Sequence, residues 1–314
     1  MTVPVQHWPD NTAGYDGCVR ARSLKWQSKL ILLLVVPFTA VSVAYQAQTC
    51  ASISPAVLWW TLGLSTALGL LAWLARAGTP AAAATGALLT ASLMFSTAST
   101  PFAPWRTALV PLLAFMVITS VATRFGRARK ERLGTAEAKH GRGAAQVAAN
   151  LGLAALVALP RAQEWLIDSR WFGVTALAPI PILAPILAAL AEAAADTVSS
   201  ELGQVLGGRP WMLTTLRRVD PGTDGAISLA GTLAGIVAAA VVAASGVWAL
   251  HGDTQLFLLS WAGGVFGLFF DSLLGATVER AVWLNNDAVN FLSTASAAGF
   301  VLAILAAMPH PGIG

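Results

Sequence analysis

The chain has 314 residues, of which 56% are hydrophobic and only 11% are charged. This balance argues against an ordinary soluble domain and indicates that a lipid bilayer is the main solvent of the protein. The net charge of +4 does not point to nucleic acid as a partner, because the Lys and Arg residues are distributed between apolar segments.

Apolar segments recur along the chain. A transmembrane helix needs about 20 mainly apolar residues, and open sheet edges cannot face lipid. We therefore predict an all-α fold: a polytopic transmembrane helix bundle of about nine spans, formed by one domain at residues 29–314 after a polar leader at 1–28. Prolines at 179, 181 and 185 predict a kinked or broken sixth span. The expected spans are 30–48, 55–75, 80–98, 106–123, 143–160, 171–197, 225–248, 255–276 and 287–307.

The distribution of basic residues predicts the orientation of these spans. With a cytoplasmic N-terminus, the outer side carries only three of the nineteen Lys and Arg residues, namely Arg106, Arg161 and Arg170. This bias is the one that the positive-inside rule describes. The polar segments 124–142, 198–224 and 277–286 then share the cytoplasmic face, where nucleotides occur. We expect an integral protein of the cell inner membrane whose functional site faces the cytoplasm.

The segment 124–142 contains seven Lys and Arg residues. Its simplest interpretation is a topology signal that also contacts lipid headgroups. The alternative is a basic funnel that leads phosphate groups to Lys139 and Arg142, which open the next helix. Gln146 and Asn150 follow with a spacing of four and share one helix face, where they could bind a substrate or hydrogen-bond to a neighbouring helix.

Polar residues interrupt the end of the sixth apolar segment. Glu192, Asp196 and the pair Ser199 and Ser200 are three or four residues apart, so they share one helix face, whereas Glu201 points elsewhere. Placing a carboxylate inside a membrane costs free energy, so a functional role is the first hypothesis for such a residue. A carboxylate and hydroxyl groups at a membrane boundary suit Mg²⁺, which is held by one or two carboxylates together with substrate phosphates.

The loop before the seventh span combines turn dipeptides with phosphate-binding residue types. Its glycines allow backbone N–H groups to approach a ligand, its hydroxyl groups are donors, and its two arginines suit bidentate contact with phosphate. This convergence predicts an anion-binding nest, and the alternative is a tight turn with an ordinary helix cap. The candidates are Arg217, Arg218, Gly222, Thr223, Asp224, Gly225, Ser228 and Thr232.

Two later segments add candidates. Asp271 lies on a stripe of small residues, of the kind that lets helices approach closely, and placed against Asp196 it could complete a metal site. Asn286 and Asn290 open the last span with a spacing of four, next to Asp287. An N-cap explains one of these residues, but it does not explain Asn290 inside the membrane.

Several familiar motifs are missing from the sequence. GxxxxGK followed by Ser or Thr does not occur, which excludes a P-loop. The four His residues are isolated, so a zinc site is not expected. The pair Asp224-Gly225 is not followed by the Ala-Arg and the paired aspartates of CDP-alcohol phosphotransferases.

Five ordered blocks carry a resemblance to a known family. The blocks are GRGAAQVAAN (141–150), ADTVSSELG (195–203), PGTDGAISLAGTLAG (221–235), DSLLGATVE (271–279) and NNDAVNFLST (285–294). Together they resemble the transmembrane-protein-19 family of integral membrane proteins, which includes the plant phytyl-phosphate kinase of tocopherol synthesis. The resemblance covers about residues 140–300, and the family is similar to CTP-using polyprenol and dolichol kinases.

This resemblance implies a Mg²⁺-dependent kinase. Such an enzyme transfers a phosphoryl group from a nucleoside triphosphate, CTP or another, to a phytyl-type or geranylgeranyl-type monophosphate lipid and yields the diphosphate. Asp196 and Asp271 would bind Mg²⁺, with Glu201 and Asp287 as lesser candidates. The donor phosphates would lie at Arg217, Arg218 and the 222–225 turn. The acceptor phosphate or the base would contact Arg142, Gln146, Asn150 and Asn290.

Two other classes of protein fit parts of the pattern. A transporter or flippase for a small anion or lipid phosphate would favour broken helices and polar groups at the membrane centre, whereas here the polar residues cluster toward one face. A non-enzymatic scaffold leaves Asp196, Asp271 and Asn290 unexplained. Membrane lipids are expected partners, and a homodimer is left open.

Overall fold

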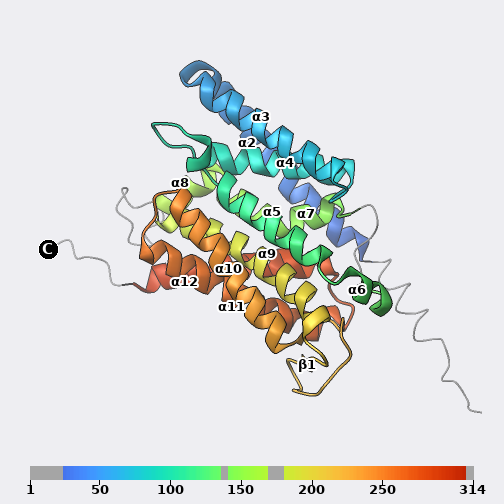
Figure 1. The fold of residues 1–314 in the computed structure, drawn as a ribbon. Helices are drawn as coiled ribbons and strands as arrows, with labels where there is room; N and C mark the ends of the chain where they lie inside the picture. The colour runs from blue at the N-terminus through green and yellow to red at the C-terminus, as the bar shows by residue number, and fades with distance from the viewer. Residues whose placement is uncertain (1–23, 136–140, 169–179, 309–314) are drawn as a thin grey trace, which may run out of the picture.

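The computed structural model describes residues 24–135, 141–168 and 180–308, and their regular structure is almost entirely helical (Figure 1). The all-α prediction is therefore confirmed. The elements are α2 (Lys25–Ile53), α3 (Pro55–Leu74), α4 (Pro80–Ser96), the 3₁₀ turn η1 (Pro104–Arg106), α5 (Leu109–Arg124), α6 (Arg127–Leu133), α7 (Ala144–Val157), α8 (Pro160–Asp168), α9 (Ile180–Leu206), β1 (Trp211–Met212), β2 (Ala226–Ile227), α10 (Leu229–Ala249), α11 (Thr254–Leu274), the π-helical turn η3 (Gly275–Glu279) and α12 (Asn286–Ala307).

The lengths and compositions of the helices indicate which segments can cross a membrane. In the described part of the chain, six helices are long and apolar enough: α2, α3, α9, α10, α11 and α12. The bent pairs α5 with α6, at 64°, and α7 with α8, at 49°, raise the number to eight if each pair is one span. Every expected span contains a helix, but α4 has only 17 residues, about 26 Å of helix, which is short for a hydrocarbon core of about 30 Å. The expected number of nine is not confirmed, and the side of the N-terminus stays a prediction.

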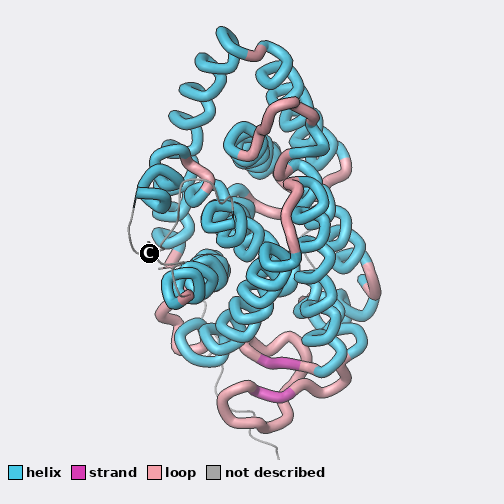
Figure 2. Tube along the Cα trace, turned by 90° about the vertical axis from the view of Figure 1, so that its left-hand side faces the viewer, coloured by secondary structure: helices cyan, strands magenta, loops and turns pink. Residues whose placement is uncertain are grey.

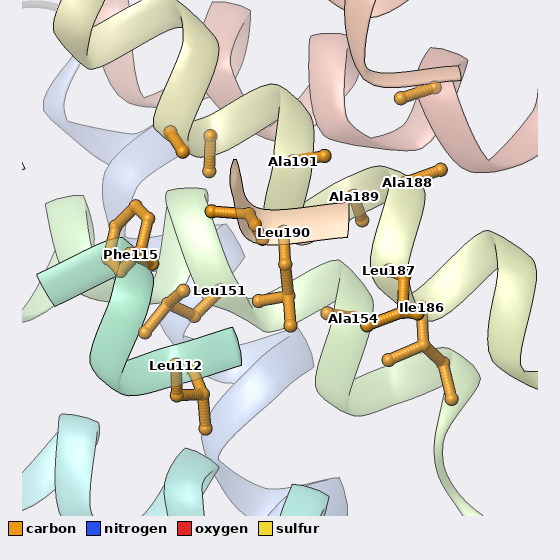
Figure 3. Packing of buried hydrophobic residues seen from close by; sticks show 14 of the residues in the cluster. Leu112, Phe115, Leu151, Ala154, Ile186, Leu187, Ala188, Ala189, Leu190 and Ala191 are labelled. Carbon is orange, nitrogen blue, oxygen red and sulfur yellow. The ribbon is translucent and has the colours of Figure 1, made fainter. Parts of the chain in front are cut away.

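Helix α9 forms the centre of the bundle. It packs against α5, α7, α10, α11 and α12, and 78% of its apolar window is buried, against 17–39% for the other five long helices. Figure 3 shows part of this core, with residues 186–191 of α9 among apolar side chains of α5 and α7. Neighbouring helices therefore surround most of α9, so that Glu192 is buried and Asp196 is partly buried, whereas the helix becomes exposed at Ser200.

Small residues allow α10 and α11 to approach α9 closely. A Cβ atom added at Gly235 of α10 would lie 2.8 Å from the carbonyl oxygen of Ala195, and one added at Gly267 of α11 would lie 2.4 Å from Cγ of Glu192. Side chains at either position would push the helices apart. The small-residue stripes that contain these glycines thus bring the acidic face of α9 against its neighbours.

The sixth span differs from its predicted bounds. Helix α9 begins at Ile180, continues past Pro185 and ends at Leu206, so the described chain is not interrupted at Pro185, and Glu201 belongs to the helix. Pro181 occupies the first turn, where a missing N–H costs little. The predicted residues 171–179 lie outside the described residues, as do residues 1–23 of the predicted leader, whereas α2 already begins at Lys25.

Between α9 and α10 the chain forms a small hairpin. Strands β1 and β2 pair antiparallel, with Trp211 opposite Ile227 and Met212 opposite Ala226. The hairpin lies outside the helices, at the lower edge of the bundle in both Figure 1 and Figure 2. Its loop contains the 222–225 turn and leads directly into α10.

Candidate functional site

A cavity of about 370 Å³ lies at the hairpin end of the bundle, and we call it the acidic cavity. It is bounded by the C-terminal half of α9, the hairpin loop, the end of α11 with η3, and the first turns of α7 and α12. The predicted residues that line it are Arg142, Gln146, Asn150, Asp196, Ser199, Ser200, Glu201, Gly222, Thr223, Asp224, Gly225, Ser228, Asp271, Asn286 and Asn290. The fold thus brings most of the predicted set together from separate helices.

A pair of carboxyl groups forms the floor of this cavity. Asp196 of α9 and Asp271 of α11 lie within hydrogen-bonding distance of each other, and the charge of Asp196 acts on Glu192, one turn earlier on α9. The Oδ1 atom of Asp271 is buried and has no hydrogen-bond partner among the described residues. Buried polar atoms are normally satisfied. An oxygen left open beside a second carboxyl group has the chemistry that a cation ligand requires.

The cavity is rich in carboxyl groups. Asp196, Glu201, Asp224, Asp271 and Glu279 line it, and Arg142 is the one cation among the described residues that do so. In the described chain, no group of three or more His, Cys, Asp and Glu side chains has the arrangement of a metal site built from protein alone. Mg²⁺ needs only one or two carboxylates, because water and substrate phosphates complete its octahedral shell. The Asp196–Asp271 pair fits that mode of binding.

The 222–225 turn is held against the end of α11. Gly222 and Gly225 have φ angles of +87° and +70°, which L side chains rarely adopt. A Cβ atom at Gly225 would also lie 2.0 Å from the backbone nitrogen of Ala276 in η3. The turn therefore requires glycine at this position for two independent reasons, conformation and space. Its contact with η3 brings Asp224 near Glu279 and Arg280.

Asp224 is the loop carboxyl group of the site. Its partial burial raises its pKa, and the guanidinium of Arg280 opposes that rise. The charges of Asp224 and Asp196 both act on Glu279. Glu279 was not among the predicted site residues, although it closes the block at 271–279. The signal that could have identified it is its position at the end of that block, two turns after Asp271 and at the same end of the bundle.

Several predicted residues have structural hydrogen bonds inside the site. The side-chain oxygen of Gln146 accepts from the Gly143 backbone N–H at 3.1 Å, and Ser228 Oγ accepts from the Gly231 N–H at 3.1 Å. Asn290 Nδ2 donates to Asn150 Oδ1 at 3.0 Å and joins α12 to α7. These bonds support the cap and interhelical interpretations, and they also fix the walls of the cavity.

Four predicted residues do not line the cavity: Arg217, Arg218, Thr232 and Asp287. The hairpin turns both arginines outward, where they are exposed. The guanidinium of Arg218 stacks 3.6 Å from the ring centroid of Trp211 and donates to the carbonyl oxygen of Arg209. The expected contact of these arginines with donor phosphates is therefore not supported, because local turn geometry directs their side chains away.

The other two residues serve helix packing. Thr232 lies in the first turn of α10, where its backbone N–H donates to the Ser228 carbonyl oxygen at 2.8 Å. Asp287 accepts a hydrogen bond from Ser28 Oγ at 2.6 Å, next to the helix cap formed by Asn285. Asp287 thus ties the start of α12 to the start of α2, outside the lining of the acidic cavity.

Glu201 is engaged in a buried ion pair. Its Oε2 lies 2.5 Å from Nζ of Lys130, and the Lys130 side chain is 1% exposed. Lys130 also donates to the carbonyl oxygens of Ala122 and Thr123, at 2.8 and 3.0 Å. Glu201 lines the cavity, but its charge is neutralised by Lys130. This pair, which joins α6 to α9, was not predicted, because its members lie 71 residues apart in the chain.

Arg142 is positioned by its backbone. Its N–H donates to the carbonyl oxygen of Ala77 and its carbonyl oxygen accepts from the Thr79 N–H, both at 3.0 Å. The preceding Gly141 has a φ of +73° and sits against Ala77. The connection between α3 and α4 thereby fixes Arg142 at the edge of the acidic cavity.

Comparison with known proteins adds family information. The integral membrane protein family DUF92 matches residues 63–298. Uncharacterized membrane protein MJ0933 of Methanocaldococcus jannaschii is 44% identical over 108 residues, which are 34% of this chain and 45% of that protein. Uncharacterized membrane protein sll0875 of Synechocystis is 32% identical over 212 residues, 64% of this chain and 74% of that protein.

A plant relative is more distant. Protein VTE6, chloroplastic, of Arabidopsis thaliana is 29% identical over 195 residues, 61% of this chain and 56% of that protein. The matched part of the chain thus spans about half the length of the first and third of these relatives. No solved structure matches the chain.

Proposed function

Because the chain belongs to the DUF92 family of integral membrane proteins, we propose an activity that suits a phosphate site at the end of a helix bundle. The protein is a kinase that transfers a phosphoryl group from a nucleoside triphosphate, such as CTP, to a prenyl monophosphate of the phytyl or geranylgeranyl type. Its active site faces the cytoplasm at the inner membrane. The observation that carries this proposal is the acidic cavity, in which Asp196, Asp271 and the 222–225 turn meet.

The reaction requires little covalent chemistry from the protein. An oxygen of the acceptor phosphate attacks the γ-phosphorus of the donor, the bond from that phosphorus to the bridging oxygen breaks, and the nucleoside diphosphate leaves. The acceptor phosphate is ionised near neutral pH, so no strong base is needed. Catalysis of such transfers depends mainly on positioning and on electrostatic stabilisation of the phosphoryl oxygens.

The chain's residues can supply both. The carboxylates of Asp196 and Asp271 hold Mg²⁺, which neutralises the charge of the donor phosphates when it is bound. Backbone N–H groups of the 222–225 turn contact the donor phosphates. Arg142 contacts the acceptor phosphate. This division of roles follows the charge of the walls, because Arg142 is the only cation that lines the cavity within the described chain.

The test uses the purified full chain in detergent with γ-labelled nucleoside triphosphates and geranylgeranyl monophosphate. We expect labelled diphosphate that depends on Mg²⁺ and disappears with excess chelator. Asp196→Asn and Asp271→Asn should each lower kcat by about 100-fold or more, since they remove electrostatic stabilisation of the transferred group. Glu164→Gln is the matched control, because Glu164 is an exposed acid of α8 that pairs with Arg161.

Two results would overturn the proposal. One is the absence of any diphosphate product together with no binding of any triphosphate. The other is a liposome flux of an anion or lipid phosphate that survives Asp196→Asn, which would favour transport.

A further inference from the structure

A second cavity lies beside the acidic cavity, between α3, α4, α5 and α7. Its volume is about 510 Å³, within the range of about 300–1,000 Å³ typical of small-molecule sites. The walls are mainly apolar, and the larger apolar side chains among them are Leu68, Leu112, Phe115, Met116 and Leu151. The roles assigned above to the acidic cavity make no use of this space.

The charge of this second cavity is opposite to that of the first. Five cations line it, Arg76, Arg124, Arg127, Lys130 and Arg142, and none of the described residues that line it is acidic. Arg127 pairs with Glu131, and Lys130 with Glu201. Arg76 and Arg124 are the cations of the α3–α4 turn and of the end of α5, and Arg142 is the cation that also lines the acidic cavity. The cavity combines apolar walls with basic groups contributed by the α3–α4 turn, the end of α5 and the start of α7.

Two details connect this basic end to the acidic cavity. Arg142 lines both cavities, and its backbone is hydrogen-bonded to Ala77 and Thr79 in the α3–α4 turn. Thr123, which lines the second cavity, has a buried hydroxyl group without a partner among the described residues. A phosphate group held by Arg142 would thus lie where the two cavities meet.

We propose that this second cavity is the acceptor cavity: it holds the apolar chain of a prenyl monophosphate, whose phosphate lies between Arg76, Arg124 and Arg142. The identity of the ligand rests on the proposed function, and the location of its chain and headgroup is new. An amphiphile with one anionic end matches both the walls and the cations. The acceptor phosphate then reaches the acidic cavity at Arg142, which lines both cavities.

The first experiment tests where the chain of the lipid binds. The purified full chain in detergent is photolabelled with a diazirine-bearing geranylgeranyl monophosphate, without nucleotide, and the labelled peptides are mapped. We expect labels in α3, α4, α5 and α7. Gly86→Leu should lower labelling about 10-fold, because a Cβ there meets only Val147 Cγ1, at 3.8 Å, and the rest of the side chain enters the cavity.

Gly63→Leu is the matched control for this variant. Gly63 is also a helical glycine, on an exposed face of α3, with no atom within 4 Å of an added Cβ, and it does not line the cavity. Equal labelling of the two variants would overturn the proposal. If Gly86→Leu does not fold, the map of the wild-type labels decides, since labels confined to the lipid-facing side of α2 or α12 would contradict it.

A second experiment tests the headgroup. Arg76→Gln and Arg124→Gln should each weaken binding of geranylgeranyl monophosphate about 10-fold, the loss expected for one charge-assisted hydrogen bond, whereas the exposed Arg129→Gln should not. Unlabelled geranylgeraniol should compete weakly. If phosphatidic acid competes as well as the prenyl monophosphate, the cavity is a general phospholipid site and the proposal is wrong.

These binding assays separate the two proposals. Labelling needs no nucleotide, so it can succeed even if no kinase activity is found. Conversely, suppose that diphosphate forms from geranylgeranyl monophosphate at equal rates in Gly86→Leu and Gly63→Leu. In that case the proposed kinase activity is supported and the proposed acceptor cavity is wrong.

Discussion

The contact between the hairpin loop and η3 leads to a sharp prediction about Gly225. Gly225→Ala places a side chain at a φ of +70° and 2.0 Å from the Ala276 nitrogen, whereas Gly208→Ala places one at +63° with no atom within 4 Å. Both variants carry the cost of a left-handed Ala, about 1–2 kcal/mol. Only Gly225→Ala also carries an overpacking cost, about 1–3 kcal/mol or more, because the obstructing atom belongs to the backbone.

Gly208→Ala thus isolates the cost of the collision. The free energy of unfolding can be measured in mixed micelles by titration with SDS and followed by tryptophan fluorescence. We expect Gly225→Ala to be less stable than Gly208→Ala by about 1–3 kcal/mol and to lose kinase activity, since the turn must move away from η3 and take Asp224 with it. Equal stability and equal activity of the two variants would refute the close packing of the turn on η3.

The remaining predictions concern a buried ion pair, a hydrogen bond between two helices and the titration of one carboxyl group. Lys130→Met should cost about 3–5 kcal/mol of stability because it leaves Glu201 unpaired in a buried place, and adding Glu201→Gln should recover part of that loss in a melting experiment. A double-mutant cycle with Asn150→Ala and Asn290→Ala should give a coupling of about 0.6–1.7 kcal/mol, as for interhelical hydrogen bonds in membranes. Burial raises the pKa of Asp224, so its neutral form favours the folded state. The stability that Asp224 contributes should be complete below the ordinary pKa of an aspartate and should be lost as the pH rises through the raised pKa, and Asp224→Asn should remove this dependence on pH.

Each of these predictions has a control or an outcome that would contradict it. For the buried ion pair it is Arg127→Gln, which breaks an exposed pair with Glu131 and should cost no more than about 1 kcal/mol. A loss for Lys130→Met as small as this one would contradict the buried pair. Additive losses in the asparagine cycle would show that the two amides do not interact. An unchanged pH profile in Asp224→Asn would assign the titration to another group.

The sequence predicted the features that depend on local pattern. Each expected span contains a helix. A run of apolar residues marks a segment that lies in lipid, and such a segment must satisfy its backbone hydrogen bonds internally. The meeting of Asp196 and Asp271 also followed from the sequence. Two costly acids near the same end of two spans favour a shared site, and the small residues around Asp271 indicated close helix contact.

The features that the sequence did not reveal depend on tertiary geometry. Arg217 and Arg218 have the right chemistry for phosphate, but the register of a short hairpin decides where their side chains point. Lys130 was assigned only to a basic topology segment. Its burial and its ion pair with Glu201 depend on the bend between α5 and α6. The acceptor cavity is formed by four helices with ordinary apolar sequences, so no motif marks it.

The central position of α9 has a consequence for biogenesis. A charged residue near the middle of a lone transmembrane helix is penalised by about 2.5–3.5 kcal/mol on the insertion scale of the translocon, and α9 carries Glu192, Asp196 and Glu201. Its shielding comes from α10, α11 and α12 as well as from α5 and α7. Three of these helices are synthesised after α9. Nascent α9 therefore has to wait at the translocon or beside an insertase until the last third of the polypeptide arrives, and truncation before α10 should leave it a target for membrane quality control.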